Sequence, residues 1–335
     1  MRAGAVAVVL VLAALVLSAG TARSGAGSRP LRVALVLEPA GPRDPYGRIA
    51  LAGFRRAVRD FGVDGKVLTQ APAESAFPDF AALARQRYDL VVGLGILQAE
   101  ALDQAARAYP RTRFALVDTP WEDLPHRPAN VLGTVYRTEE AAYLAGYLAA
   151  RMEERRPGSD VVSVVGAYRR VPTIDPFIAG FRAGARAADL HVTVLVGYAN
   201  DFVDRAKCRR VALSQIARGS GAVFQVAGGC GVGALDAARR KGVWGIGVDT
   251  DQSSLGPHIL TSVVKRMDLA VYELVRSLKH GTFRPGRDLA EDLRNGGVGL
   301  GKVSSKVPRA LLAQVERARR QIVDGTIADI PTTVK

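Results

Sequence analysis

The sequence is poor in the residues that build catalytic and metal centres. It has two cysteines and four scattered histidines in 335 residues, the histidines being His126, His191, His258 and His280. The patterns H-E-x-x-H, C-x-x-C and G-x-S-x-G do not occur, which argues against zinc-protease, dithiol and hydrolase chemistry. Nothing places a nucleophile beside a base. We therefore expect a binding protein without a metal or cofactor rather than an enzyme.

The sequence also lacks an apolar run of the roughly 18 residues that a membrane-spanning helix needs. An apolar stretch from Ala5 to Leu17 follows Met1-Arg2 and precedes small residues, which is the layout of a cleaved signal peptide over about residues 1–26. Thr21 stands where a lipoprotein would carry a cysteine, so a lipid anchor is not supported. We expect an exported protein, secreted or associated with the cell membrane, with an uncleaved membrane tether as the alternative.

The charge is strongly one-sided, with 46 Lys and Arg against 32 Asp and Glu and a formal net charge of +14. Such an excess can indicate nucleic acid or an anionic membrane as a partner. Here the basic residues recur in short groups on predicted helices, without a concentrated stripe or interleaved aromatics. We interpret them as a solvated surface and expect no nucleic-acid partner.

The two cysteines, Cys208 and Cys230, would both remain after export, and an oxidising compartment permits a disulfide between them. Cys208 falls in the first turn of a predicted helix, and Cys230 follows the next predicted strand. Both therefore lie at one edge of the predicted sheet. A disulfide and two free thiols remain the alternatives.

Short apolar or β-branched runs alternate with segments of helical spacing through most of the chain, which indicates an α/β protein with parallel sheets covered by helices. So many units predict two doubly wound lobes, and the absence of a Ser- or Pro-rich linker favours lobes joined by short chain crossings, a hinge that closes on a ligand. We assign residues 31–136 plus about 258–290 to an N-terminal lobe, and 137–257 plus part of 291–335 to a C-terminal lobe. The predicted strands are 31–37, 90–92, 114–117, 131–136, 161–165, 192–196, 222–226 and 243–248.

Polar groups at strand ends mark the expected ligand cleft, because ligands of open parallel sheets bind beyond the carboxyl ends of the strands. Asp118 and Asp249 each follow a predicted strand, and carboxylate acceptors are well matched to the paired hydroxyls of a sugar. Asp251 has a simpler interpretation as a helix N-cap. Glycine clusters follow two further strands, at residues 93–95 and 228–233.

The second glycine cluster imitates a dinucleotide-binding fingerprint. Gly229, Gly231 and Ala234 fit G-x-G-x-x-A, and Asp249 lies twenty residues after Gly229. The unit comes late in the chain, however, and an exported protein has little access to nicotinamide cofactors. The favoured interpretation is that these glycines let the backbone approach a ligand.

Four segments together resemble the basic membrane protein family of ABC-transporter solute-binding lipoproteins. The first runs from Asn130 to Ala150 and includes E-E-A-A-Y-L-A-G-Y-L-A-A, and the second is F-I-A-G-F-R-A-G at 177–184. The others are the glycine cluster and I-G-V-D-T-D-Q at 246–252, followed by T-S-V-V-K at 261–265. The resemblance covers nearly all of the mature chain. It implies a type I periplasmic-binding fold and the capture of a purine nucleoside for import.

The resemblance also implies the site residues, because the family holds the base between two aromatic rings and the ribose with carboxylates and a lysine. By position, Tyr46 and Phe202 are the rings, with Gly231 beside the second ring. Asp118, Asp249 and Lys265 are the ribose contacts. The ordinary alternative for each ring is packing in the core or on the surface.

Two departures from the family pattern affect the expected ligand. The family segment D-K-S-F-N is R-D-P-Y-G at 43–47, so an asparagine contact is lost and Tyr46 adds a hydroxyl to the first ring. The lipoprotein cysteine is absent. We expect a monomeric extracytoplasmic receptor that delivers a purine nucleoside or related ligand to an ABC permease. The alternatives are a ligand sensor with a membrane signalling partner, which neighbouring permease genes would exclude, and an exported nucleoside-acting enzyme, which absence of turnover would exclude.

Overall fold

The computed structural model describes residues 29–71, 75–158 and 160–334, so the predicted signal peptide lies outside the described residues. The first of two sheets is entirely parallel, with strand order β11-β5-β4-β3-β1-β2. Helices α1 and α8 pack on one face of this sheet, and α2 and α3 pack on the other. The strands are β1 (Arg32–Leu37), β2 (Asp64–Thr69), β3 (Leu90–Leu94), β4 (Arg113–Val117), β5 (Val131–Tyr136) and β11 (Arg287–Glu291), and the helices are α1 (Pro45–Phe61), α2 (Phe77–Arg85), α3 (Ala99–Ala108) and α8 (Met267–Lys279).

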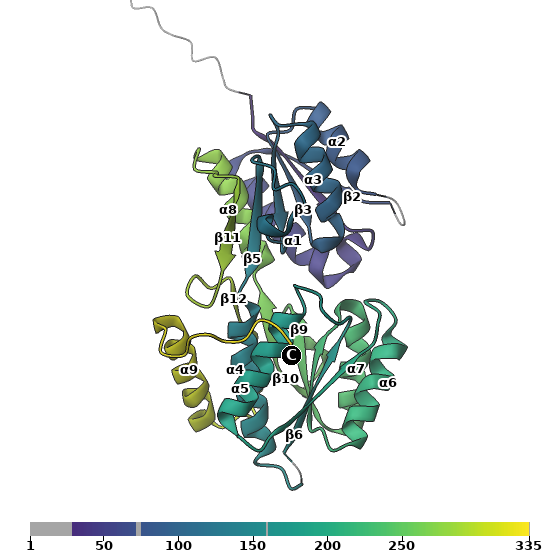
Figure 1. Ribbon diagram of the computed structural model, residues 1–335, viewed down its shortest axis with the longest axis vertical. Coiled ribbons are helices and arrows are strands. Elements are labelled where there is room, and N and C mark those ends of the chain that lie inside the picture. The colour runs from purple at the N-terminus through teal and green to yellow at the C-terminus, as the bar shows by residue number, and fades with distance from the viewer. Residues whose placement is uncertain (1–28, 72–74, 159, 335) are drawn as a thin grey trace, which may run out of the picture. The chain divides into compact units, whose positions relative to one another are not determined.

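The second sheet has the order β12-β10-β9-β8-β6-β7, and only its edge strand β12 is antiparallel among the described residues. Helices α4 and α5 pair with each other on one side, and α6 and α7 pair on the other (Figure 1). The strands are β6 (Val161–Gly166), β7 (Thr193–Tyr198), β8 (Ala222–Val226), β9 (Trp244–Asp249), β10 (Ile259–Lys265) and β12 (Val298–Leu300), and the helices are α4 (Thr138–Glu153), α5 (Asp175–Ala188), α6 (Arg205–Ala217), α7 (Gly228–Lys241) and α9 (Arg309–Asp324). The prediction of an α/β protein with two doubly wound sheets is confirmed.

The two sheets repeat one topology. In each, the first strand of the lobe lies between the second and the third, and the fourth and fifth follow in order. The fourth strands are β4 and β9, which Asp118 follows and Asp249 ends. Because ligands of such sheets bind at the carboxyl ends of the strands, the repeat gives the two aspartates equivalent positions in their sheets.

Three chain crossings connect the sheets, at Arg137, at Arg266 and at residues 292–297. The two ends of the third crossing are hydrogen-bonded to the other two, since Arg137 N donates to the carbonyl of Glu291, just before it, and Arg266 N donates to Gly297 O, each at 2.8 Å. The crossings therefore lie together, as expected of a hinge. One predicted boundary is wrong: residues 259–265 form β10 of the second sheet, so the chain returns to the first sheet at Arg266 and not near residue 258.

A disulfide joins Cys208 of α6 to Cys230 of α7. Both side chains are fully buried, and the two Cα atoms lie 5.6 Å apart. The backbone N–H of Cys230 donates to the carbonyl of Phe202 at 2.8 Å. The bond therefore fixes the start of α7 close to the loop that carries Phe202.

The buried carboxyl group of Glu153, at the end of α4, makes the free energy of unfolding depend on pH. Its side chain is 2% exposed, and burial, followed by repulsion from Asp160, raises its pKa to about 7 although Arg156 lowers it. A raised carboxyl pKa means that the folded state binds the proton more tightly than the unfolded state. This stabilisation is complete below about pH 4.5 and is lost as the pH rises to about 7.

We therefore expect Glu153→Gln to flatten the decline in stability between pH 4.5 and pH 7. Urea midpoints measured across this range would test it, with Glu154→Gln as the control because Glu154 is exposed. If the urea midpoint of Glu153→Gln fell with pH as steeply as that of the wild type, the raised pKa of Glu153 would not be the cause of the decline.

Candidate functional site

A buried ion pair at the ends of two strands forms the centre of the candidate site. Lys265, the last residue of β10, is 3% exposed, and its Nζ donates to Asp118 Oδ2 at 2.8 Å and to Oδ1 at 3.0 Å. Asp249 Oδ1 lies 3.7 Å from the same nitrogen. Lys265 Nζ also lies 5.0 Å from the ring centroid of Phe177. One lysine of the second sheet thus joins the two aspartates that occupy equivalent positions in the two sheets.

Tyr46, in the first turn of α1, belongs to the same group. Its hydroxyl donates to Asp118 Oδ2 at 3.1 Å, so the hydroxyl that distinguishes it from phenylalanine is already used inside the protein. The neighbouring Gly47 leaves no space for a side chain, because a β-carbon there would lie 2.6 Å from the carbonyl oxygen of Gly41. The packing therefore accounts for glycine in place of the family asparagine.

Glu38, which follows β1, was missed by sequence reasoning and lies beside this group. A β-carbon at Gly95 would lie 2.9 Å from Glu38 Oε1 and 3.1 Å from Tyr46 Oη, so both polar groups face that glycine. Gly95 has a φ of +71°, a conformation that favours glycine. The signal in the sequence was available, because Glu38 follows a buried strand as Asp118 does.

The electrostatics of the site are dominated by carboxylates. Burial, followed by repulsion from Asp44 and Asp118, raises the pKa of Glu38 to about 7. Burial also raises the pKa of Asp249 to about 6, against the lowering effect of Lys265. Burial alone would lower the pKa of Lys265, but Asp118 and Asp249 raise it. The site therefore has more acceptors than donors and suits a ligand that offers hydroxyl or N–H groups.

Both aspartates have an unusual backbone conformation, with φ of +64° at Asp118 and +62° at Asp249. Positive φ is uncommon outside glycine and costs free energy, and it concentrates at functional sites. The backbone N–H of Asp118 donates to Thr134 Oγ1 at 2.9 Å, which helps to hold the turn. The same strain at both positions supports a common role.

Phe202 lies in the loop between β7 and α6. The residue is 38% exposed, and its ring centroid lies 5.2 Å from that of Tyr168, a residue that sequence reasoning missed. Asp201 braces this loop by accepting from Val203 N at 2.8 Å and by pairing with Lys207 Nζ at 2.7 Å. Among the described residues, Phe202 makes no hydrogen bond or ring contact with Asp118, Asp249 or Lys265. It is an accessible aromatic surface on the second lobe.

The glycine cluster divides into two parts. Gly228 and Gly229 face Phe202, since β-carbons at these positions would lie 3.5 Å and 3.4 Å from its carbonyl oxygen. Gly231 is buried in α7, and a β-carbon there would collide with the side chain of Gln225. Helix packing therefore explains Gly231 in this structure. Asp251 Oδ1 accepts from Ser253 N at 3.0 Å, but the N-cap position of the short helix at 253–255 is Gln252, one residue later than the sequence predicted.

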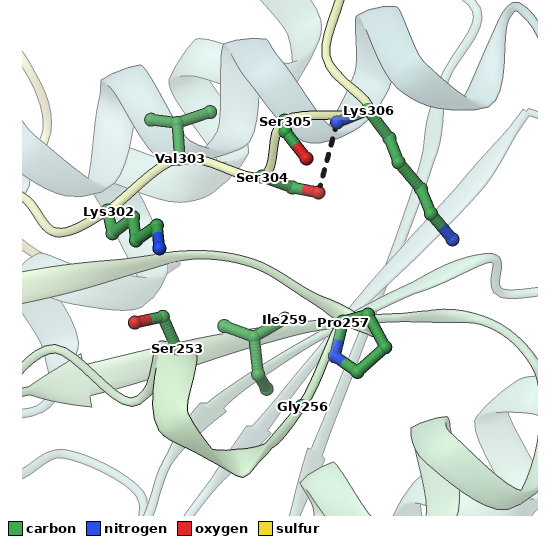
Figure 2. Close-up of a pocket in the computed structure, with 9 residues that line it drawn as sticks. All are labelled: Ser253, Gly256, Pro257, Ile259, Lys302, Val303, Ser304, Ser305 and Lys306. Carbon is green, nitrogen blue, oxygen red and sulfur yellow. Dashed lines mark hydrogen bonds between the residues drawn. The ribbon is translucent and has the colours of Figure 1, made fainter.

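A hollow of about 270 Å³ lies elsewhere, beside the start of β10 and the segment after β12 (Figure 2). Figure 2 shows Lys302, Ser253 and Ile259 along it, with Ser304 accepting from Lys306 N at 3.4 Å. Its lining contains none of the predicted site residues. It does not contribute to the candidate site.

Comparison with known proteins gives one family. Residues 33–331 match the family model described as ABC transporter substrate-binding protein PnrA-like. The chain is 30% identical to a CD4+ T-cell-stimulating antigen of Listeria innocua over 90% of this chain and 88% of that protein. It is 28% identical to the ABC transporter nucleoside-binding protein BmpA of Lactococcus lactis subsp. cremoris, over 91% and 90%. An ABC-transporter solute-binding protein from Aeropyrum pernix K1 has a similar structure, with a TM-score of 0.77, 24% identity and coverage of 90% and 94%.

Proposed function

The chain belongs to the PnrA-like family of ABC-transporter substrate-binding proteins, and we propose that its ligand is a purine nucleoside held between the two lobes. Membership makes the protein a binding protein and not an enzyme. Such proteins act outside the cytoplasm and deliver a small ligand to a membrane permease. No helix among the described residues is long and apolar enough to cross a membrane.

The observation that carries the proposal is the group formed by Asp118, Asp249 and Lys265. Two carboxylates at the ends of equivalent strands, and the ammonium that ends the neighbouring strand β10, offer acceptors and a donor to vicinal hydroxyls, which is the requirement of a ribose. In our proposal the ribose contacts these three residues from both lobes, because Asp118 follows a strand of the first sheet and the other two end strands of the second. Binding would therefore favour closure of the lobes.

The base is assigned to the aromatic side chains. In the proposed complex, Tyr46 and Phe202 stack on opposite faces of the purine, and Gly228 and Gly229 take the place of Gly231 beside the second ring. The partial exposure of Phe202 supports this role, since a ring that only filled the core would be buried. Glu38 supplies an acceptor for N–H groups on the base edge, and a buried acceptor left unpaired costs about 1–3 kcal/mol.

A single substitution tests the stacking role of Phe202. We expect Phe202→Ala to weaken nucleoside binding about tenfold, because offset stacking contributes about 0.5–1.5 kcal/mol beyond the burial of the ring. Calorimetric titration would measure the change. Val203→Ala is the matched control, since Val203 is the next residue and is 79% exposed. Equal affinity in both variants and the wild type would remove Phe202 from the site.

A further inference from the structure

A separate cavity of about 210 Å³ lies on the hinge side of the Asp118–Lys265 ion pair. It is formed where β5 passes into α4, where α5 begins, and where the C-terminal segment contributes Thr332. Tyr46, Asp249 and Phe202 are not part of its lining, so only the ion pair is shared with the proposed nucleoside site. The lining residues are Asp118, Pro120, Thr134, Val135, Tyr136, Arg137, Thr138, Glu139, Pro172, Thr173, Pro176, Lys265 and Thr332.

One buried hydroxyl in this cavity is poorly paired. Tyr136 is 6% exposed, and its hydroxyl makes no hydrogen bond of good geometry to the described residues, although the side chain of Thr134 lies beside it. A buried polar group in this condition costs about 1–3 kcal/mol. A molecule in the cavity with a hydroxyl of its own could both donate to and accept from Tyr136 and remove that cost.

The remaining lining indicates the chemistry of such a molecule. The charges are balanced in pairs, since Lys265 is bound to Asp118 and Arg137 lies 3.3 Å from Glu139. The first turns of α4 and α5 already carry acidic residues, which offset the positive ends of these helices and disfavour an anion. Four threonines line the walls together with Tyr136. These features suit a neutral molecule with several hydroxyl groups.

The volume of the cavity limits the size of the molecule that it can hold. At about 30 Å³ for each water molecule, the cavity has room for roughly seven waters. We propose that it is a second binding site, for a neutral polyol no larger than a single sugar ring. The site would contact the first lobe through Thr134 and the second through Thr138 and Thr173, so its occupancy would be coupled to the hinge. By linkage, a ligand here and a ligand in the cleft change each other's affinity equally.

Calorimetry with glycerol and D-ribose tests this proposal on residues 29–335, with and without a saturating purine nucleoside. We expect saturable binding of at least one probe, which Tyr136→Phe weakens about 2- to 10-fold through loss of one hydrogen bond. Thr173→Phe should abolish binding by filling the cavity. Tyr198→Phe is the control for the loss of a hydroxyl, because Tyr198 lies on the edge strand β7.

Four experimental outcomes would each contradict the proposed second site. Absence of saturable binding by either probe would overturn the proposal, as would binding that both Tyr136→Phe and Thr173→Phe leave unchanged. Loss of probe binding in Asp249→Ala, a proposed ribose contact outside the lining of this cavity, would assign the probe to the cleft and would also overturn the proposal. Preferential binding of inorganic phosphate would contradict the neutral class. Because these titrations do not require nucleoside binding, failure of the proposed nucleoside function would leave the second site standing.

Discussion

Replacing Lys265 by methionine is expected to lower the free energy of unfolding by about 3–5 kcal/mol and to abolish nucleoside binding. The substitution leaves Asp118 buried without its cation, and an unpaired buried charge is the costly element of a broken ion pair. The double variant Lys265→Met/Asp118→Asn removes both charges, so it should recover most of the stability. It should not recover binding, because the ribose contacts are gone.

Urea unfolding and calorimetry on the same preparations separate these effects. Arg266→Met is a matched control, since Arg266 is the next residue and its partner Asp268 is more exposed. Full binding by the double variant would show that the ion pair only supports the fold. A single variant as stable as the wild type would contradict the burial of this pair.

Removing the disulfide should have the second largest effect. Cys208 and Cys230 are 22 residues apart, and closing a loop of that length stabilises a protein by about 3 kcal/mol in the chain-entropy model. We expect the double variant Cys208→Ala/Cys230→Ala to have a free energy of unfolding about 3 kcal/mol lower than that of the wild type. Nucleoside affinity should fall as well, because the disulfide fixes the start of α7, where the backbone N–H of residue 230 donates to the carbonyl of Phe202.

Chemical unfolding under non-reducing conditions measures the loss. Wild-type protein treated with a reductant should approach the stability of the variant, which serves as the internal control. Mass mapping that finds two free thiols in the untreated protein would show that the disulfide does not form. A variant with unchanged stability would show that the bond constrains little.

The sequence was sufficient to predict the buried strands but not the edge strands of the sheets. Strands such as β1 and β3 are buried on both faces and appear as nearly continuous apolar runs. β2 was missed because it is a half-exposed edge strand with the mixed sequence DGKVLT. β11 and β12 were missed for a similar reason, since both are short edge strands whose partners lie far away in the sequence.

The sequence was likewise sufficient to predict some features of the candidate site but not others. Asp118 and Asp249 stand at strand ends, where the rule for parallel sheets directs attention. Their meeting at Lys265 depends on the packing of two sheets, which no local pattern contains. Gly231 shows a second limit, because a glycine required by helix packing against Gln225 has the same sequence signal as one required by a ligand.

The identity of the ligand is the central claim, and calorimetric titration of residues 29–335 tests it most directly. Adenosine, guanosine, inosine, the free bases and D-ribose would be compared. The account predicts one nucleoside bound per chain with a Kd below millimolar, and weaker binding of the free base because it lacks contacts with Asp118, Asp249 and Lys265. Failure of every nucleoside to bind below millimolar concentration would contradict it.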